Sequence, residues 1–187
     1  SIKNGTSTYT HPAFTFGNQE LTGFWVGKFE VSGSTSQIKI KPNVSSYKGQ
    51  SMASFFTAIQ NMSIRYSLNG DSHMIKNMEW GAVAYLSHSK YGTCTDGECV
   101  EVGINNNSSY ITGCGATAWS SASSMCNAYN TTTGMLASTT QNIYGIYDMH
   151  GGSYEYAMGN MVNGSGSFYS SDSGFNTISS LKYYDSY

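Results

Sequence analysis

Four cysteines constrain this chain more than any other feature, because their spacing predicts where the backbone must turn. Cys94 and Cys99 flank the segment 95–98, whose centre is Asp-Gly, a preferred pair for a two-residue β-hairpin turn. The two cysteines of such a hairpin face each other at a non-hydrogen-bonded position, with Cα atoms about 4.5 Å apart. A disulfide accepts that distance. The sequence therefore predicts a Cys94–Cys99 disulfide, and it leaves Cys114–Cys126 as the second pair.

A zinc site and free thiols are the alternatives for these cysteines. The two close pairs leave gaps of four and eleven residues, which is not a standard zinc-finger spacing. Disulfides are therefore favoured. Two of them would be typical of an oxidising compartment, so we expect a secreted, cell-surface or virion protein.

Composition favours one folded domain over residues 1–187. Charged residues make up only 11% of the chain and aromatic residues 14%, whereas disordered segments are usually highly charged and poor in aromatics. The net charge is −2 and Arg65 is the one arginine, so no basic patch suggests nucleic-acid binding. No apolar run approaches the roughly 20 residues of a membrane span, and we expect none in this chain.

Hydrophobic periodicity predicts two helices and a few strands. Alternation predicts strands over 21–32, over 37–41 and within 142–162. A helix is expected after Ser51, its predicted N-cap, and another over 75–92, where Asn77 could cap the helix and Glu79 suits the first turn. Residues 1–20 read as a polar lead-in with at most one short strand, and 93–141 as a hairpin followed by a long, disulfide-pinned loop region. This order is an α+β pattern.

Three segments in the same order resemble the formylglycine-generating enzyme (sulfatase-modifying factor) family, a branch of the C-type-lectin-like fold. They are "FWVGKFEVS" (24–32), "IKNMEWGAVAYLS" (75–87) and "IYGIYDMHGGSYEYAMGN" (143–160). The last is similar to the family signature "GLYDMHGNVWEW", with Tyr154 and Tyr156 replacing two tryptophans. The resemblance implies a C-type-lectin-like fold in which two helices pack on short antiparallel strands with long loops. The wider pattern also resembles domains of prepilin-like and phage-associated surface proteins of gut Firmicutes.

The departures from the family bear on function. The family's oxygen chemistry depends on a copper-binding cysteine pair in the C-terminal third, and no cysteine follows Cys126. We therefore expect no formylglycine-generating activity, and no enzyme of another kind. The family's closing C-terminal strands are also missing before the final "LKYYDSY". The chain could thus be a fragment with an open sheet edge, to which another chain could pair.

Glu155 is the candidate metal ligand. In the family, the signature turn binds Ca²⁺ through this glutamate, a neighbouring asparagine and backbone carbonyls, and Gly152 stands where that asparagine would be. Because Ca²⁺ takes six to eight oxygen ligands, the loss of one leaves a weak calcium candidate at Glu155 and Gly152. The alternative is a Glu155 that only bonds backbone within the turn.

Two functions are compatible with these observations. The first is a non-catalytic extracellular binding or display domain, of the adhesin or receptor-binding type, with a glycan or protein ligand. The second is a structural subunit of a pilus or filament, whose partners are other copies of itself. We expect residues 142–160 to form a strand, a glycine turn and a second strand whose aromatics fill the core. Recognition would then lie in the loop region 93–141, although its ligand-binding residues are unknown.

Overall fold

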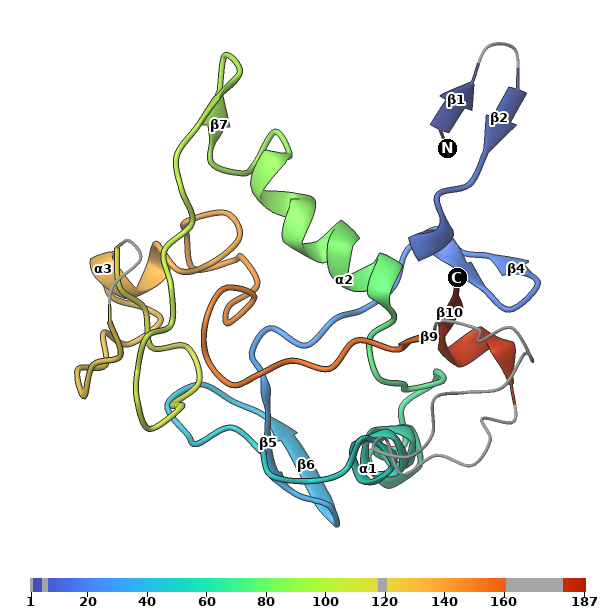
Figure 1. The fold of residues 1–187 in the computed structure, drawn as a ribbon, viewed down its shortest axis with the longest axis horizontal. Helices are drawn as coiled ribbons and strands as arrows, with labels where there is room; N and C mark the ends of the chain where they lie inside the picture. Colours follow the sequence, from blue (N-terminus) through green and yellow to red (C-terminus); the bar gives the residue numbers. More distant parts are fainter. Residues whose placement is uncertain (1, 5–6, 118–120, 161–179) are drawn as a thin grey trace. The chain divides into compact units, whose positions relative to one another are not determined.

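The computed structural model describes residues 2–4, 7–117, 121–160 and 180–187 (Figure 1). The chain divides into two compact units, each described by itself. Unit 1 consists of Ser1–Val26, Gln50–Ala82 and Tyr156–Tyr187, and unit 2 consists of Gly27–Gly49 and Val83–Glu155. The strand pairs are short and mostly antiparallel, and the helices are few. The predicted mixture of α and β structure is therefore confirmed.

Unit 1 begins with two small hairpins. In the first, β1 (Ile2–Asn4) pairs antiparallel with β2 (Ser7–Tyr9). In the second, β3 (Thr15–Phe16) pairs with β4 (Gln19–Glu20), after a 3-10 turn, η1 (Pro12–Phe14). The prediction of at most one short strand in residues 1–20 was therefore wrong. These strands are only two or three residues long, too short to show an alternating pattern in the sequence. The second hairpin turns at Gly17, whose φ is +61°.

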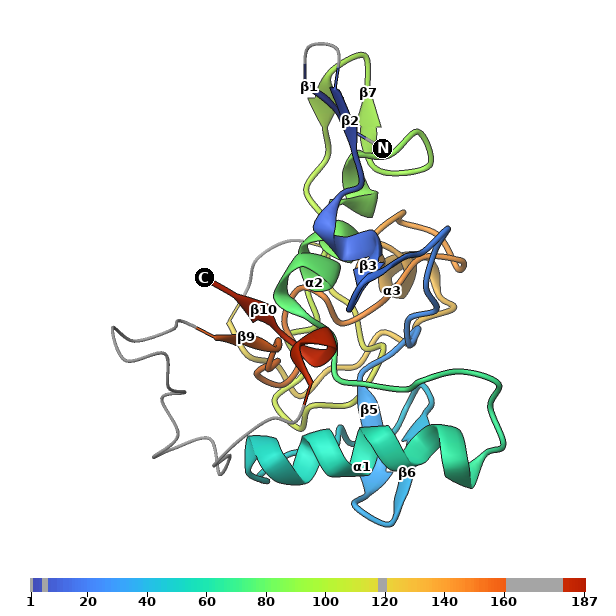
Figure 2. The same cartoon turned by 90° about the vertical axis from the view of Figure 1, so that its right-hand side faces the viewer.

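Helix α1 (Met52–Arg65) confirms the first predicted helix, and it is seen along its length in Figure 2. Ser51 caps it as expected, with its Oγ accepting from the backbone N–H of Ser54 at 3.3 Å. The buried positions are Phe55 and Ala58. Within unit 1 the Phe55 ring lies 6.2 Å from that of Tyr156.

Helix α2 (Asn77–Ala84) and the 3-10 turn η2 (Tyr85–His88) form the second predicted helix, which ends four residues early. Beyond η2 the N–H of Thr93 donates to the carbonyl of Ser87 at 2.7 Å, and a Cβ at Gly92 would lie 2.0 Å from the same carbonyl oxygen. Val83 is buried as expected, whereas Leu86 is 39% exposed.

The C-terminal residues of unit 1 form a further 3-10 turn and a strand. The turn η3 (Leu181–Tyr183) leads into β10 (Asp185–Ser186), which pairs parallel with β9 (Gly159–Asn160). Met158, just before β9, bridges in turn to Lys76. The final "LKYYDSY" therefore contributes one two-residue strand.

Unit 2 has little regular structure. Strand β5 (Val31–Ser34) pairs with β6 (Gln37–Ile40), β7 (Cys94–Thr95) pairs with β8 (Glu98–Cys99), and α3 (Thr132–Met135) is a single turn. The β7–β8 hairpin has the predicted register, with Cys94 opposite Cys99 and a disulfide between them. Its turn residues Asp96 and Gly97 both have positive φ, as a type I′ turn requires.

The predicted strand over 21–32 was wrong except at its last two residues. Residues 21–30 are irregular, because their partners are single groups and not a neighbouring strand. The carbonyl of Lys28 accepts from the N–H of Tyr147 at 2.9 Å, and the Phe29 ring packs on that of Tyr147 at a centroid distance of 5.2 Å. The alternation of residues 24–31 therefore reflects side-chain contacts on one side of the segment. Residues 24–30 form no hydrogen-bonded strand ladder.

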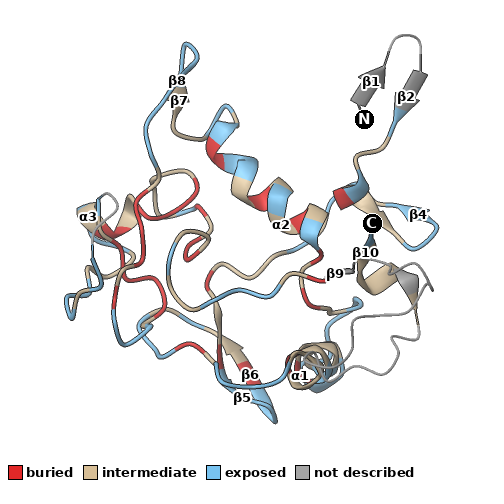
Figure 3. Cartoon of the chain, viewed as in Figure 1, coloured by how far each residue is buried: buried red, intermediate tan, exposed pale blue. Residues whose placement is uncertain are grey.

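The predicted strand–turn–strand over 142–160 was also wrong. Only β9 is a strand there, although the glycine turn exists, with Gly151 and Gly152 at φ +87° and +75°. Among the tyrosines, Tyr147 is 2% exposed and fills the core, whereas Tyr154 is 97% exposed. Figure 3 shows that buried residues of unit 2 gather on irregular segments. A left-handed Asp148, at φ +66°, interrupts the extended backbone that a strand would need.

Candidate recognition loop

The segment 104–128, which we call the recognition loop, folds without a sheet. Isolated bridges join its parts: Ile104 to Ala116 and Gly115 to Asn127 antiparallel, and Asn107 to Ser123 parallel. Residues 118–120 lie outside the described residues. Since single bridges supply few backbone hydrogen bonds, other groups must satisfy the remaining buried amides and carbonyls.

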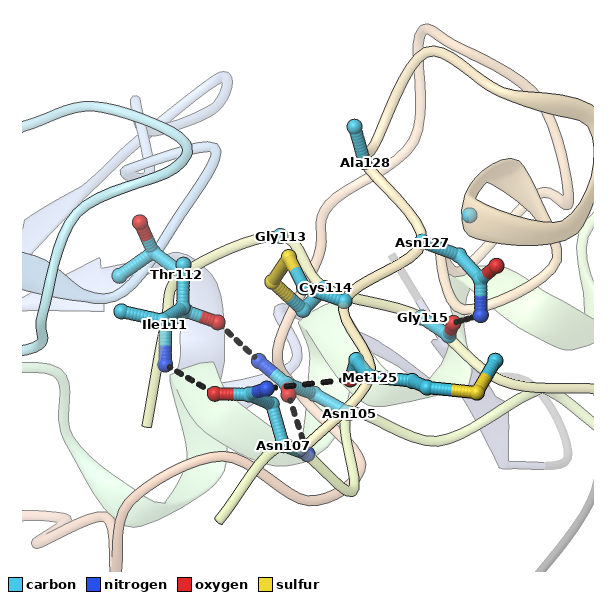
Figure 4. Close-up of a disulfide and its surroundings, with 12 residues drawn as sticks. Asn105, Asn107, Ile111, Thr112, Gly113, Cys114, Gly115, Met125, Asn127 and Ala128 are labelled. Carbon is cyan, nitrogen blue, oxygen red and sulfur yellow. Dashed lines mark hydrogen bonds between the residues drawn. A yellow bond between two sulfur atoms is a disulfide. The ribbon is translucent and has the colours of Figure 1, made fainter. Parts of the chain in front are cut away.

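Buried asparagine side chains supply those bonds (Figure 4). Asn105, 3% exposed, donates to the carbonyl of Ile111 at 2.8 Å, and its Oδ1 accepts from the N–H of Asn107 at 3.2 Å. Asn107 donates to the carbonyl of Met125 at 3.0 Å and accepts from the N–H of Ile111 at 3.3 Å. A carboxamide can donate and accept at once, so each side chain connects two segments of the loop.

Asp148 is hydrogen-bonded to two residues of the recognition loop. Its carboxylate is 1% exposed and accepts from the side chain of Asn105 at 2.8 Å and from the N–H of Gly113 at 2.9 Å. Burial raises the pKa of Asp148, while these donated hydrogen bonds oppose the rise. Asp148 lies in the segment 143–160, whose sequence resembles the family signature. Its partners, 43 and 35 residues away, gave no sequence signal.

The Cys114–Cys126 disulfide closes the loop, as predicted. Cys114 is 1% exposed, whereas Cys126 reaches the surface. Next to it, Gly113 has φ +71°, and a Cβ there would lie 3.0 Å from the Phe29 ring. Any side chain at this position would be strained and would displace the aromatic core. The loop is therefore pinned both covalently and by close packing.

Among its described residues, the recognition loop exposes serine hydroxyls and the large side chains of Tyr110 and Met125. Ser108, Ser109, Ser121 and Ser124 are exposed, Met125 is 68% exposed and Tyr110 is 37% exposed. Tyr110 has φ +55°, a conformation that is uncommon for an aromatic residue. Two backbone hydrogen bonds at 2.9 Å, to Asn107 and from Ser46, hold it there. Lys48 lies over its ring, 3.7 Å from the centroid.

The calcium candidates lie near a different acid. Glu155 is exposed, and Gly152 is half-buried. A Cβ at Gly152 would lie 2.5 Å from Oε1 of Glu30, so the Glu30 carboxylate occupies the space that a side chain at 152 would fill. Glu30 Oε1 accepts from the N–H of Ser153 at 2.9 Å. Its other oxygen, Oε2, is buried and accepts no hydrogen bond from the described residues.

Burial and neighbouring charges favour the protonated form of the Glu30 carboxyl group. Burial raises its pKa to about 8, with the charges of Asp148 and Glu155 adding to the effect. Across the described ranges, these three acids do not bring three ligand oxygens within 4.8 Å of one another. Their carboxylates alone do not fit the six to eight oxygens that Ca²⁺ takes. Calcium binding at Glu155 stays a prediction, which a calcium titration followed by thermal unfolding would check.

Unit 1 contains a buried charged cluster that the sequence did not reveal. Glu79, 2% exposed, accepts from the backbone N–H of Lys76 at 2.9 Å and lies 3.1 Å from Nε2 of His73. Burial opposes charging of His73, but its hydrogen bond and attraction to Glu79 outweigh this and raise its pKa. The spacing of three between His73, Lys76 and Glu79 was the available signal. With every member partnered, the cluster is structural.

Comparison with protein-family models, with curated proteins and with solved structures gives no match. Within the described ranges, no helix is long and apolar enough to cross a bilayer. The recognition loop and its surroundings are therefore the features of the molecule that bear on its function.

Proposed function

We propose that this protein is a non-catalytic extracellular binding domain, of the adhesin or receptor-binding type, and that the recognition loop contacts its ligand. The observation that carries this proposal is an irregular loop whose described residues are held together by the buried side chains of Asn105, Asn107 and Asp148 and by a disulfide. Rigid loops bind at a smaller entropic cost than mobile ones. The two disulfides are typical of an oxidising compartment, which supports placement on a cell surface or virion.

The chemistry of the loop favours an uncharged ligand. From Val102 to Tyr147 the chain contains no Asp, Glu, Lys, Arg or His. Exposed Ser, Tyr and Met side chains offer hydroxyls and a polarizable thioether, as adaptable recognition surfaces do, and Lys48 over the Tyr110 ring is a charged neighbour of the loop. A neutral glycan or an uncharged protein surface fits this loop better than an ionic ligand.

The C-type-lectin-like fold is part of the same proposal. Its support is the resemblance of the segments 24–32, 75–87 and 143–160 to the formylglycine-generating enzyme family. The long irregular loops of unit 2, pinned by disulfides, agree with such a fold. In this proposal the family's binding architecture is kept and its copper chemistry is absent.

A glycan array probed with the purified chain tests the proposal. We expect binding to neutral glycans that is reduced at least tenfold by Tyr110→Ala or Met125→Ser. Tyr144→Ala is the matched control, because Tyr144 is 88% exposed in unit 2 but outside the loop. Because the loop is uncharged, affinity should change little between low and physiological salt. A glycan ligand whose binding tolerates both loop variants would contradict the proposal.

The alternative is a structural subunit of a pilus or filament. Among the described strands, β10 pairs only with β9, and a strand edge without a neighbour is a place where another chain can pair. Electron microscopy of native material distinguishes the two functions, because only the filament requires a repeating interface well above about 1,000 Å².

A further inference from the structure

We propose that opening the Cys94–Cys99 disulfide creates a zinc-binding site formed by Cys94, Cys99 and His88. A ring nitrogen of His88 and the two sulfurs lie within 4.8 Å of one another, and this is the one such group of His, Cys, Asp or Glu ligands within the described ranges. The site lies in unit 2 and is separate from the recognition loop.

The three ligand atoms lie close enough to reach the separations of tetrahedral zinc after a small movement. Zn–S bonds are about 2.3 Å and Zn–N bonds about 2.0–2.1 Å, so ligand atoms around a tetrahedral Zn²⁺ lie roughly 3.5–3.8 Å apart. His88 already lies within reach of both sulfurs. Once the disulfide opens, side-chain rotation has only to move the sulfurs apart to this separation.

Backbone contacts hold the three ligands together without the disulfide. The N–H of Thr93 donates to the carbonyl of Ser87 at 2.7 Å, and the N–H of Val100 donates to the carbonyl of Thr93 at 3.0 Å. The β7–β8 pairing keeps Cys94 opposite Cys99. Because these bonds tie the base of the hairpin to η2, reduction should leave Cys94 and Cys99 beside His88.

The surroundings of His88 orient its ring. Ser87 Oγ lies 3.0 Å from Nδ1 of His88, and the Tyr85 ring stacks on the imidazole at 4.7 Å with an interplanar angle of 7°. Neighbouring groups that fix a histidine ring raise its value as a metal ligand. His88 and Cys99 are exposed and Cys94 is half-buried, so water can complete a fourth coordination position.

The chemistry is a two-electron reduction followed by metal binding. A dithiol passes two electrons and two protons to the Cys94–Cys99 bond and is itself oxidised to a disulfide. Zn²⁺ then displaces the two thiol protons and binds two thiolates and the neutral imidazole. The exposed acids Asp96 and Glu98 of the same hairpin favour approach of a cation.

Selective reduction makes the test possible. Both ends of the Cys94–Cys99 bond reach solvent to some degree, whereas Cys114 is 1% exposed, so a mild dithiol should open the hairpin disulfide first. Alkylation followed by peptide mass mapping identifies the opened pair. The reductant is removed without oxygen before metal is added, because dithiols themselves bind zinc. A Cys114→Ala, Cys126→Ala variant repeats the experiment with a single cysteine pair.

Titration with Co²⁺, a spectroscopic substitute for Zn²⁺, gives the readout. We expect one Co²⁺ per reduced chain, thiolate-to-metal charge-transfer absorption, and displacement by Zn²⁺. The oxidised chain and a Cys94→Ser, Cys99→Ser variant should bind none. His88→Ala should weaken binding at least tenfold, whereas His11→Ala, a change in unit 1, should not. Absence of metal binding by the verified reduced pair, or equal affinity in His88→Ala, would overturn the proposal.

Discussion

Asp148 illustrates how much one side chain can organise when a chain has few strands. It lies in a left-handed conformation, at φ +66°, and its carboxylate receives N–H groups from Asn105, Gly113 and, at 3.4 Å, Glu30. These donors come from both segments of unit 2, Glu30 from Gly27–Gly49 and the other two from Val83–Glu155. The two carboxylate oxygens therefore accept hydrogen bonds from N–H groups that a neighbouring strand would otherwise satisfy.

Replacing this carboxylate tests its role. Asp148→Asn keeps the size and tolerates positive φ, but its NH₂ would face N–H donors. We expect the free energy of unfolding to fall by about 1–3 kcal/mol, the cost of leaving buried polar groups unpaired. Urea denaturation measures this, and hydrogen exchange should show faster exchange at Gly113.

Asp96→Asn is the matched control for that variant. Asp96 also has positive φ, at +52°, but it is exposed at the tip of the β7–β8 hairpin. Surface substitutions usually change stability by less than about 0.5 kcal/mol. If both variants lost the same stability, the buried hydrogen bonds of Asp148 would not be responsible.

At the scale of elements, α2 is capped from the far end of the sequence. The N–H of Met78 donates to Oδ2 of Asp185 at 2.7 Å, and Nζ of Lys76 lies 3.8 Å from the other oxygen. Asn77, the cap predicted from the sequence, instead donates its side-chain N–H to the hydroxyl of Tyr187 at 2.6 Å. The C-terminal segment of unit 1 thus supplies the negative charge that a helix N-terminus favours.

Removal of this remote cap should weaken α2. We expect Asp185→Ala to lower the free energy of unfolding by about 0.5–2 kcal/mol, as loss of other N-caps does. Asp185→Asn, which keeps an acceptor but loses the charge, should lose less. Exchange rates of the amides in the first turn of α2 report the effect directly. Unchanged rates in Asp185→Ala would show that the helix does not depend on this contact.

Elements whose stability is local were predictable, and those that depend on distant groups were not. Ser51 and the apolar face of α1 lie within one segment, as do the two cysteines of the β7–β8 hairpin. The segments 21–30 and 142–158 alternate like strands, yet their hydrogen bonds join single groups far apart in the chain, such as Lys28 with Tyr147 and Glu30 with Asp148. For the recognition loop, the sequence predicted a disulfide-pinned loop region over 93–141 and the Cys114–Cys126 disulfide, but not the asparagine contacts that shape it.

For the whole molecule, buried acids link stability to pH. Glu30 has a pKa of about 8 in the folded chain, against 4.5 as its ordinary value. Between these values the folded state keeps a proton that the unfolded state has lost. Stability from this group is therefore complete below about pH 4.5 and declines as pH rises towards 8, by at most about 1.4 kcal/mol per pH unit.

Glu30→Gln should remove this dependence. The amide cannot ionise, so we expect the stability of unit 2 to fall less between pH 5.5 and pH 7.5 than in the unmodified chain. Urea denaturation at both pH values, followed by amide resonances of unit 2, measures the difference. Glu98→Gln, an exposed change in the same unit, should leave the pH dependence as it is. Parallel pH profiles for both variants would rule out Glu30 as the titrating group.

The scarcity of regular structure in unit 2 also affects how its native state looks in solution. Far-ultraviolet circular dichroism responds to repeating backbone geometry, and here α3 and two strand pairs are short. The near-ultraviolet spectrum responds to fixed aromatic rings, and Phe29, Tyr129 and Tyr147 pack within 5.8 Å of one another. A preparation with a weak far-ultraviolet signal can therefore be fully native, and the aromatic bands are the better criterion of folding.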